Sequence, residues 1–417
     1  MHFVNAFEIL FWICIFLVFY TFIGYGLFLY FLVKIKEIFR KPLPRTEPKD
    51  WPEVTLFIAA YNEEAIVEAK MDNCLQLNYP PHQLKILWIT DGSNDKTNEK
   101  LAQYPQVTVY HIPQRKGKTA ALNRGIQFVK TPFVIYTDAN TMLNKEAVRE
   151  MVKEFSDSRV GCVAGEKRIA VDEKDQAAAG GEGFYWTYES KLKEWDSRLY
   201  SAVGAAGELF AIRTSLFEKM PEDTLLDDFI LSMRIAQKGY KIAYCKSAYA
   251  LEKGSADIQN EEKRKIRIAA GGLQSIKRLG NLLIPNPFHL GTLRFQYISH
   301  RVLRWSVTPV ALFLLPFLNI ALVVVYPKPI YIILLILQML FYLAAFSGAL
   351  LQQKKIKIKV LFIPYYFLFM NINVLKAFFS QHKYKGKGTW ANHFNSSPGS
   401  KKNCISICSN SRMRKIN

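Results

Sequence analysis

Long segments without charged side chains constrain the fold of this chain more than any other feature. Residues 9–33, 306–326 and 329–351 contain no Asp, Glu, Lys or Arg. Each segment is long enough to cross the roughly 30 Å hydrocarbon core of a bilayer as a helix. The first is too long for the apolar part of a signal peptide, and no small-residue cleavage site follows it. The sequence therefore predicts a retained N-terminal membrane anchor and two further spans.

A fourth apolar segment, residues 360–375, is shorter and contains Pro364, so it is a short span, or a re-entrant or interfacial segment. The tail from Gln381 is basic, and basic residues also follow the first and third segments: Lys34, Lys36, Arg40, Lys41 and Arg45, then Lys354, Lys355, Lys357 and Lys359. The positive-inside rule therefore places the long middle region in the cytoplasm. A full fourth crossing would carry the tail outside. We favour a re-entrant or interfacial segment, although snorkelling of Lys376 would allow a real span.

Composition narrows the class of protein. Half of the residues are hydrophobic, which excludes a disordered chain. Juxtamembrane Lys and Arg beside anionic lipid explain the net charge of +20, so we expect the lipid bilayer, and no nucleic acid, among the partners. The six cysteines are scattered, as is typical of a reducing cytosol. Cys404 and Cys408 have no companion pair with which to form a zinc site.

The region after the first span alternates between predicted strands and helices. Short apolar segments predict strands at 54–59, 84–90, 107–111 and 133–137. Helical segments follow them at 63–77, 96–102, 118–128 and 145–155. This alternation predicts an α/β fold with a mostly parallel sheet that helices cover on both faces. In such sheets, ligands bind at the carboxyl ends of the strands.

Polar residues are concentrated at three of these strand ends: AYNEE at 60–64, DGSND at 91–95 and DANT at 138–141. Asp138 and Asn140 are two residues apart, so in extended backbone they would face the same way. Carboxylate and amide oxygens suit Mg²⁺ or Mn²⁺, and such an ion usually serves a phosphate. The basic segment QRKGK at 114–118 is a plausible diphosphate-binding loop. Each segment alone also fits a turn, a helix start or a solvated basic loop.

An acidic pair, Asp227 and Asp228, stands at the front of the apolar-periodic segment LLDDFILSMRIAQKGY. Asp is a preferred N-cap, and acidic side chains in a first helical turn interact favourably with the helix dipole. The alternative is that one Asp caps the helix and its neighbour is a catalytic base. Adjacent helical residues diverge by about 100°, so the two carboxylates can hold different roles.

In their order and spacing, these segments resemble the family 2 glycosyltransferases, specifically the membrane-bound branch that includes cellulose, chitin and hyaluronan synthases. The resemblance extends from about residue 54 to residue 305. The segments that carry it are AAYNEE at 59–64, DGSND at 91–95, RKGKTAALNRG at 115–125, TDANT at 137–141, GAAGELFAIR at 204–213 and DDFILSMRI at 227–235.

The resemblance implies a GT-A fold, which is a Rossmann-like nucleotide-sugar-binding architecture, and a donor that is most often a UDP-sugar. It assigns the metal ion to Asp138, with Asn140 where many members have a second Asp. It assigns the general base to Asp228, which would lead to inversion at the anomeric carbon. It assigns the acceptor side to Gly204, Gly207, Glu208 and Asp227. It assigns donor binding to Ala60, Tyr61, Asn62, Asp91 and Asp138. From their charge and position, Glu63, Lys118 and Arg267 are further candidates for donor binding.

One motif departs from the family pattern. The branch usually has Q-x-x-R-W after the acidic pair, and the stretch that matches here is RKIRI at 264–268, which keeps Arg267 but lacks the Trp. A literal R-x-x-R-W occurs at 301–305, where we favour a basic and aromatic anchor at the membrane interface. The missing Trp puts processive polymerisation in doubt. Aromatic residues that could replace it, or simply pack on the interface helices, are Phe184, Tyr185, Trp186 and Tyr188.

We therefore predict an inverting glycosyltransferase in a bacterial inner membrane that moves a sugar from a UDP-sugar to a saccharide or lipid-linked acceptor in cell-envelope or exopolysaccharide synthesis. The alternatives are a processive β-polysaccharide synthase coupled to export and an inactive membrane scaffold. The predicted divisions are an anchor and basic linker at 1–47, a cytoplasmic GT-A domain at 48–250, acceptor-side and interface helices at 251–305, a transmembrane region at 306–380 and a basic tail at 381–417.

Overall fold

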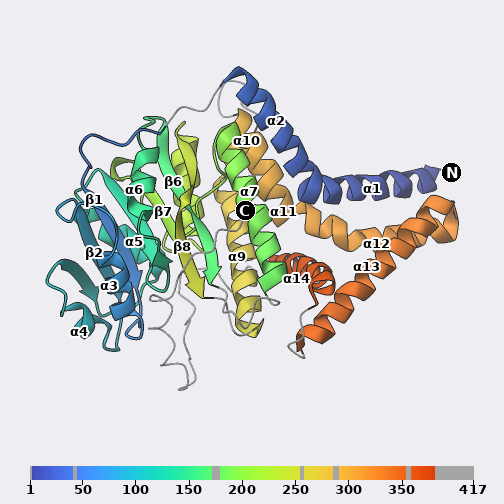
Figure 1. The fold of residues 1–417 in the computed structure, drawn as a ribbon. Helices are drawn as coiled ribbons and strands as arrows, with labels where there is room; N and C mark the ends of the chain where they lie inside the picture. Colours follow the sequence, from blue (N-terminus) through green and yellow to red (C-terminus); the bar gives the residue numbers. More distant parts are fainter. Residues whose placement is uncertain are drawn as a thin grey trace.

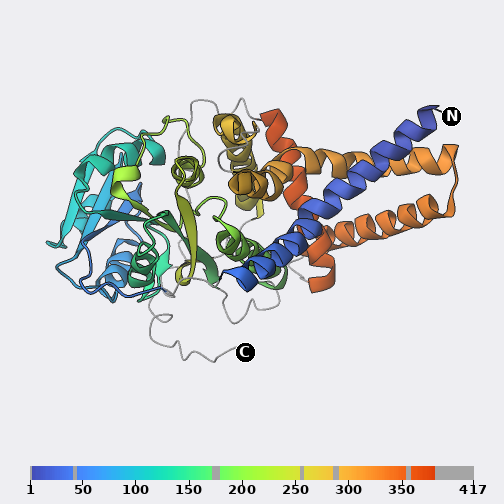
Figure 2. The same ribbon diagram turned by 90° about the horizontal axis from the view of Figure 1, so that it is seen from above.

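The structure is a computed structural model that describes residues 2–40, 45–170, 179–253, 258–284, 291–353 and 358–380. It has a sheet domain at one end and long apolar helices that project from the other (Figure 1). Helices α7 (Ala179–Leu199) and α9 (Ile258–Arg278) lie between these two parts in both views (Figures 1 and 2). The chain enters the sheet domain from the apolar helices and returns to them.

The sheet has eight strands within the described residues, in the order β3-β2-β1-β4-β7-β6-β8-β5. Strand β1 pairs in parallel with β2 and β4, whereas β7 runs antiparallel between β4 and β6. The α/β prediction is confirmed, and the antiparallel β7 is the element that strand–helix alternation did not predict. The bounds are β1 Val54–Ala60, β2 Leu84–Asp91, β3 Val107–Ile112, β4 Phe133–Asp138, β5 Met142–Leu143, β6 Val160–Ala170, β7 Leu209–Arg213 and β8 Lys241–Lys253.

Two hydrophobic cores form on the two faces of the sheet. One packs against helices α3 (Val67–Leu75), α4 (Thr97–Leu101) and α6 (Ala147–Glu154). The other packs against α5 (Lys118–Gly125) and α8 (Asp227–Gln237). Every residue of β1 is buried, because helices cover both of its faces. Because helices cover both faces of the sheet, the polar side chains lie at its carboxyl edge.

Four helices of the described chain are long and apolar enough to cross a membrane: Ala6–Phe39, Val307–Val325, Pro329–Gln352 and Val360–Ser380. The first comprises α1 (His2–Phe19), a π-helical turn (Tyr20–Gly24) and α2 (Tyr25–Phe39). Helices α1, α12 (Val307–Val325) and α13 (Pro329–Gln353) extend together away from the sheet, whereas α14 (Lys359–Ser380) runs across them (Figure 2). Helix α14 also contacts α9 and α7, so it lies against the sheet domain's side of the bundle.

Two short segments complete the path from the sheet domain to the bundle. Helix α10 (Gly291–Tyr297) continues through a π-helical turn (Ile298–Val302) into the short α11 (Leu303–Trp305), which leads directly to α12. Both π-helical turns of the described chain therefore lie where the apolar helices meet the sheet domain, and Tyr20 in one hydrogen-bonds Ser299 in the other, at 2.8 Å.

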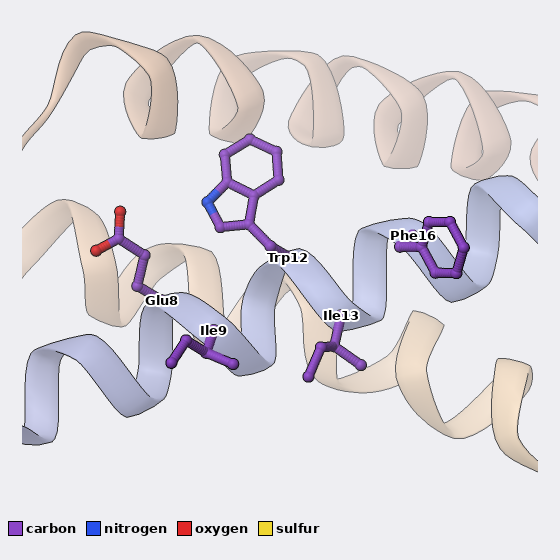
Figure 3. Close-up of a pocket in the computed structure, with 5 residues that line it drawn as sticks. All are labelled: Glu8, Ile9, Trp12, Ile13 and Phe16. Atoms are coloured by element: carbon purple, nitrogen blue, oxygen red, sulfur yellow. The ribbon is translucent and has the colours of Figure 1, made fainter.

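A cavity of about 570 Å³ lies along one stretch of α1, far from the sheet. Its lining residues are Glu8, Ile9, Trp12, Ile13 and Phe16 (Figure 3). Most of this lining is apolar, and Glu8 accepts hydrogen bonds from Tyr331 of α13 and from Lys328, which immediately precedes that helix. The cavity therefore belongs to the bundle and not to the polar edge of the sheet.

Candidate active site

The loops that follow β1 and β2 are bound to each other by hydrogen bonds. Asn62 adopts a positive φ of 55°, and its side-chain amide exchanges two bonds with Asn94, at 2.8 and 3.0 Å. The backbone N–H of Glu63 donates to Thr97 Oγ1 at 2.8 Å. The AYNEE and DGSND segments therefore meet at the carboxyl edge of the sheet.

Asp91 is buried, and neighbouring donors already occupy its carboxylate. The backbone N–H groups of Lys116 and Gly117 donate to Oδ2 at 2.9 and 2.6 Å, and Arg124 donates to Oδ1 at 3.4 Å. Asp91 is 1% exposed, so its visible role is to fix the basic loop that precedes α5. Direct contact of Asp91 with a donor molecule stays a prediction.

Tyr61 and Arg115 form a stacked pair at the same edge. The Arg115 guanidinium lies 3.8 Å from the centre of the Tyr61 ring, close enough for a cation–π interaction. Gly92 leaves room for this loop, because a Cβ at Gly92 would come within 2.7 Å of the Arg115 backbone nitrogen. The pair presents a flat, cationic surface beside the predicted donor-binding residues.

Lys118 joins three carboxylates at the first turn of α5. Its Nζ donates to Asp138 Oδ1 at 2.6 Å and lies 3.9 Å from Asp227 Oδ2. Burial alone would lower the pKa of Lys118, but the charges of Asp138, Asp227 and Asp228 outweigh burial and raise that pKa above its usual value. The structure thus brings together one ammonium and three acids that are distant in sequence.

Asp228 has the properties of a poised base. Burial and the neighbouring charge of Asp227 raise the pKa of Asp228 to about 7, although Lys118 opposes the shift. A carboxyl with a pKa near 7 exchanges protons at the operating pH far better than an ordinary Asp. Perturbed pKa values of this kind cluster at functional sites.

Neither Asp of the acidic pair caps helix α8, contrary to one of the two interpretations of the sequence. Helix α8 begins at Asp227 itself, its N-cap is Leu226, and no side chain caps it. Asp227 is 7% exposed, and its Oδ2 has no hydrogen-bond partner among the described residues. The charges of both Asp227 and Asp228 act on Lys118. The two carboxylates therefore share one environment, even though adjacent helical residues point in different directions.

Asp138 and Asn140 do not share the face of an extended strand as predicted. Strand β4 ends at Asp138, and Asn140 lies in the turn that follows, because the chain reverses there into β5. The fully buried Lys70 stabilises this turn by two hydrogen bonds. Its Nζ donates to Thr137 Oγ1 at 3.1 Å and to the Thr141 carbonyl at 2.7 Å. Binding of a metal ion by Asp138 and Asn140 stays a prediction.

The glycine-containing loop before β7 covers the acidic pair. A Cβ at Gly204, whose φ is +85°, would come within 2.2 Å of the Phe229 ring. A Cβ at Gly207 would lie 3.3 Å from both Asp228 Oδ2 and Lys118 Nζ. Because side chains at these positions would meet the ring or crowd the charged groups, glycine lets the loop lie directly on the cluster.

Glu208 is held in a chain of ion pairs that sequence reasoning missed. Lys167 contacts Glu208 at 2.5 Å and also pairs with Glu252, and Arg264 lies 3.5 Å from Glu208. Burial would raise the pKa of Glu208, but the Lys167 and Arg264 charges hold it well below its usual value. The predicted acceptor-side loop is thereby tied to α9.

Arg267 and Trp305 differ from expectation. Arg267 lies on α9 and forms no ion pair or hydrogen bond with other described residues, so the structure does not join it to the Lys118 cluster. Arg304 is 8% exposed and the partly buried Trp305 packs against the core of the sheet domain, whereas the interpretation of 301–305 as an interfacial anchor stays a prediction. The Trp305 ring lies 5.0 Å from that of Phe229, the residue after Asp228.

The predicted aromatic platform is mostly outside the described side chains, which do not include Phe184, Tyr185 and Trp186. Tyr188 donates a hydrogen bond of 2.7 Å to the Phe22 carbonyl. Tyr188 therefore packs on the N-terminal apolar helix.

Comparisons with known proteins agree with this architecture. Residues 55–220 match the family model for Glycosyl transferase family 2. The chain is 26% identical over 284 residues to a poly-beta-1,6-N-acetyl-D-glucosamine synthase of Staphylococcus aureus (strain COL), a match that covers 65% of this chain and 66% of that protein, slightly under two thirds of each. A synthase of the same name from Staphylococcus epidermidis is 26% identical over 265 residues, covering 61% and 62%.

Among solved structures, the fold is similar to that of the mannosyltransferase PcManGT from Pyrobaculum calidifontis. The TM-score is 0.67 at 21% identity, and the match covers 89% of this chain and 99% of that one. The family match and the shared architecture lead to one conclusion: residues 55–220 form a region similar to the family 2 glycosyltransferases, in a GT-A fold with apolar helices long enough to span a membrane on both sides of it.

Proposed function

We propose that the chain transfers a sugar, with inversion, from a UDP-sugar to a saccharide or lipid-linked acceptor in the synthesis of a cell-envelope polysaccharide. The observation that carries the proposal is the convergence of Lys118, Asp138, Asp227 and Asp228 at the carboxyl edge of the sheet. The staphylococcal relatives, named as poly-N-acetylglucosamine synthases, support a UDP-N-acetylhexosamine as the first donor to test.

In this proposal Asp228 removes the proton from the acceptor hydroxyl as the new bond forms. Its carboxyl, with a pKa of about 7, is present largely as carboxylate above that pH. Lys118 offers its ammonium to the diphosphate that leaves, since it stands between the acids and the basic loop that Asp91 fixes. Positive charge aimed at a developing negative charge stabilises the transition state.

A divalent cation fits the charges at this edge. Asp138, Asp227 and Asp228 face the single ammonium of Lys118, and Asp227 Oδ2 is buried without a hydrogen bond from the described residues. Burial and the neighbouring Asp138 carboxylate also raise the pKa of Glu63 to about 8. Mg²⁺ or Mn²⁺ held by Asp138, with Asn140 beside it, would relieve this repulsion, and a bound ion would supply electrostatic stabilisation of the diphosphate.

The experiment that tests the proposal is incubation of the purified full chain with a panel of labelled UDP-sugars and Mn²⁺ or Mg²⁺. We expect release of UDP and transfer of label to an added acceptor with one of these donors. A chain that binds UDP but transfers no sugar from any donor contradicts the proposal and supports the inactive scaffold.

Repeated transfer by a processive synthase is the second candidate. The absence of a Trp after Arg267 argued against it, but the partly buried Trp305 lies 5.0 Å from Phe229, the residue that follows Asp228. An aromatic ring in such a place can stack on a sugar. The length of the product distinguishes the two candidates, because single addition gives one discrete product and processive synthesis gives long chains.

We also propose that the sheet domain lies in the cytoplasm and that α14 lies along the membrane interface. The support is the Lys/Arg bias after α2 and the course of α14 across the other apolar helices (Figure 2). Helices α1, α12 and α13 then cross the bilayer, and the basic tail stays on the side of the sheet domain.

This topology predicts the labelling of single cysteines from outside the cell. A cysteine replacing Pro327, between α12 and α13, should react with an impermeant reagent, whereas one replacing Arg45 should not. A cysteine replacing Trp390 should also be protected until the membrane is permeabilised. External labelling at position 390 would show that α14 crosses the bilayer.

A further inference from the structure

Side chains of helix α9 bind the segment that directly precedes the acidic pair, residues 223–226. The side-chain amide of Gln274 makes two hydrogen bonds to the backbone of this segment. Its Oε1 accepts from the Leu225 N–H at 3.0 Å, and its Nε2 donates to the Asp223 carbonyl at 2.9 Å. An amide that accepts and donates at the same time fixes both the distance and the orientation of the backbone that it binds.

Arg278 lies one helical turn after Gln274 and binds the same segment. Its guanidinium donates to Asp223 Oδ1 at 2.6 Å and to Thr224 Oγ1 at 2.5 Å. The planar guanidinium has a fixed geometry, so these two bonds also restrict the segment. Together, four hydrogen bonds join two turns of α9 to residues 223–225.

Helix α9 also packs closely on this segment at Gly271. A Cβ at Gly271 would lie 2.6 Å from Leu226 Cγ and 3.0 Å from Leu225 Cβ. Leu225 packs in addition against the apolar cluster that α9 shares with α14. The hydrogen bonds and the packing therefore place the segment directly against α9.

The position of this segment determines where the acidic pair lies. Helix α8 begins at Asp227, its N-cap is Leu226, and no side chain caps it. On the side of α5, Thr119 Oγ1 donates to the Thr224 carbonyl at 3.0 Å, and Thr119 directly follows Lys118. The segment thus connects α9 with the helix that carries Lys118, so a displacement of the segment would change the position of Asp228 relative to Lys118.

We propose that Gln274 and Arg278 are positioning residues for glycosyl transfer, which keep Asp228 in place through residues 223–226. The inference rests on the proposed function and adds two residues that act through the backbone before the base. A misplacement of about 1 Å at a reacting group can lower a rate by roughly 10²-fold, so bonds remote from the chemistry can control turnover.

The first test is Gln274→Leu in the full chain, which removes both amide bonds at similar side-chain size. We expect kcat to fall by about tenfold to 10²-fold, while the KM for the UDP-sugar and the affinity for UDP stay at their wild-type values. Hydrogen–deuterium exchange should be faster at Leu225, because its N–H loses its acceptor, and unchanged in β1. Arg278→Met should lower kcat in the same way.

Two further variants serve as controls. Lys277→Leu changes an exposed residue of the same helical turn and should keep wild-type kcat and wild-type exchange at Leu225. Gln274→Glu keeps an acceptor for the Leu225 N–H and loses only the donor to the Asp223 carbonyl, so its kcat should lie above that of Gln274→Leu.

Wild-type kcat in Gln274→Leu, or wild-type exchange at Leu225 in that variant, overturns the proposal. A merely structural role predicts a lowered melting temperature for Gln274→Leu with kcat unchanged. The proposed function fails separately, when the wild-type chain transfers no sugar from any UDP-sugar. In that case the exchange at Leu225 still tests whether Gln274 fixes the segment.

Discussion

Replacing Asp228 by Asn should abolish glycosyl transfer while the chain still binds UDP and melts near the wild-type temperature. Loss of a positioned base typically lowers the rate by about 10²–10⁴-fold. Asn has nearly the same shape as Asp, and α8 has no side-chain cap to lose. The measurements are turnover, UDP affinity and melting temperature. Wild-type turnover in Asp228→Asn would place the base elsewhere.

Asp227→Asn is the matched control, and the pH dependence of turnover is its readout. Asp228 acts as a base only when ionised, so wild-type activity should decline as the pH falls through about 7. The Asp227 charge raises the pKa of Asp228. Removing that charge lowers the pKa, so the acidic limb of the profile should move to lower pH. A dead Asp227→Asn beside an active Asp228→Asn would reverse the assignment of the base.

Replacing Asp138 by Asn should also abolish transfer, because a bound metal ion contributes several kcal/mol to stabilising the leaving diphosphate. A loss of about 3–4 kcal/mol corresponds to roughly 10²–10³-fold in rate. Asp138 is half-buried and pairs with Lys118, so the change should also raise the Mn²⁺ concentration needed to retain UDP on the chain. Both turnover and Mn²⁺-dependent UDP binding measure the effect.

Asn140→Ala is the companion variant to Asp138→Asn. Asn140 lies in the turn after β4, and a weaker metal contact there predicts a smaller loss of Mn²⁺ affinity with much of the turnover kept. Activity that survives EDTA in the wild-type chain, or that survives in Asp138→Asn, contradicts a metal-dependent reaction at this edge.

The fold of the sheet domain could be predicted from the sequence where the local hydrophobic pattern and the tertiary contacts agree. Strands β1, β2 and β4 are mostly apolar, which is typical of strands that helices cover on both faces. The polar residues that follow them are at the carboxyl edge as predicted, since parallel strands bring those ends together. Local pattern sufficed here because each signal lies within a few residues of its own strand.

The side-chain contacts at the candidate active site could not be predicted from the sequence in this way. The sequence suggested a base at Asp228 but not its elevated pKa, which depends on burial and on Asp227. Asp91 was assigned to the donor, whereas its oxygens are bound to the 116–117 backbone. The packing of Trp305 against the core was not predicted, because an R-x-x-R-W segment before an apolar helix has the same composition whether it faces lipid or a protein core.

The contacts that the first π-helical turn makes with the second and with α12 have a consequence for the order in which this protein assembles. Tyr20 bonds to Ser299 and Thr21 to Thr308, which lie 279 and 287 positions further along the chain. A ribosome makes residues 20 and 21 long before their partners, so the first apolar helix must enter the bilayer with these hydroxyl groups unpaired by them. The sheet domain can fold meanwhile as a unit on its own helices. The two hydroxyl pairs therefore form only after the second π-helical turn and α12 have been synthesised and pack against the first apolar helix.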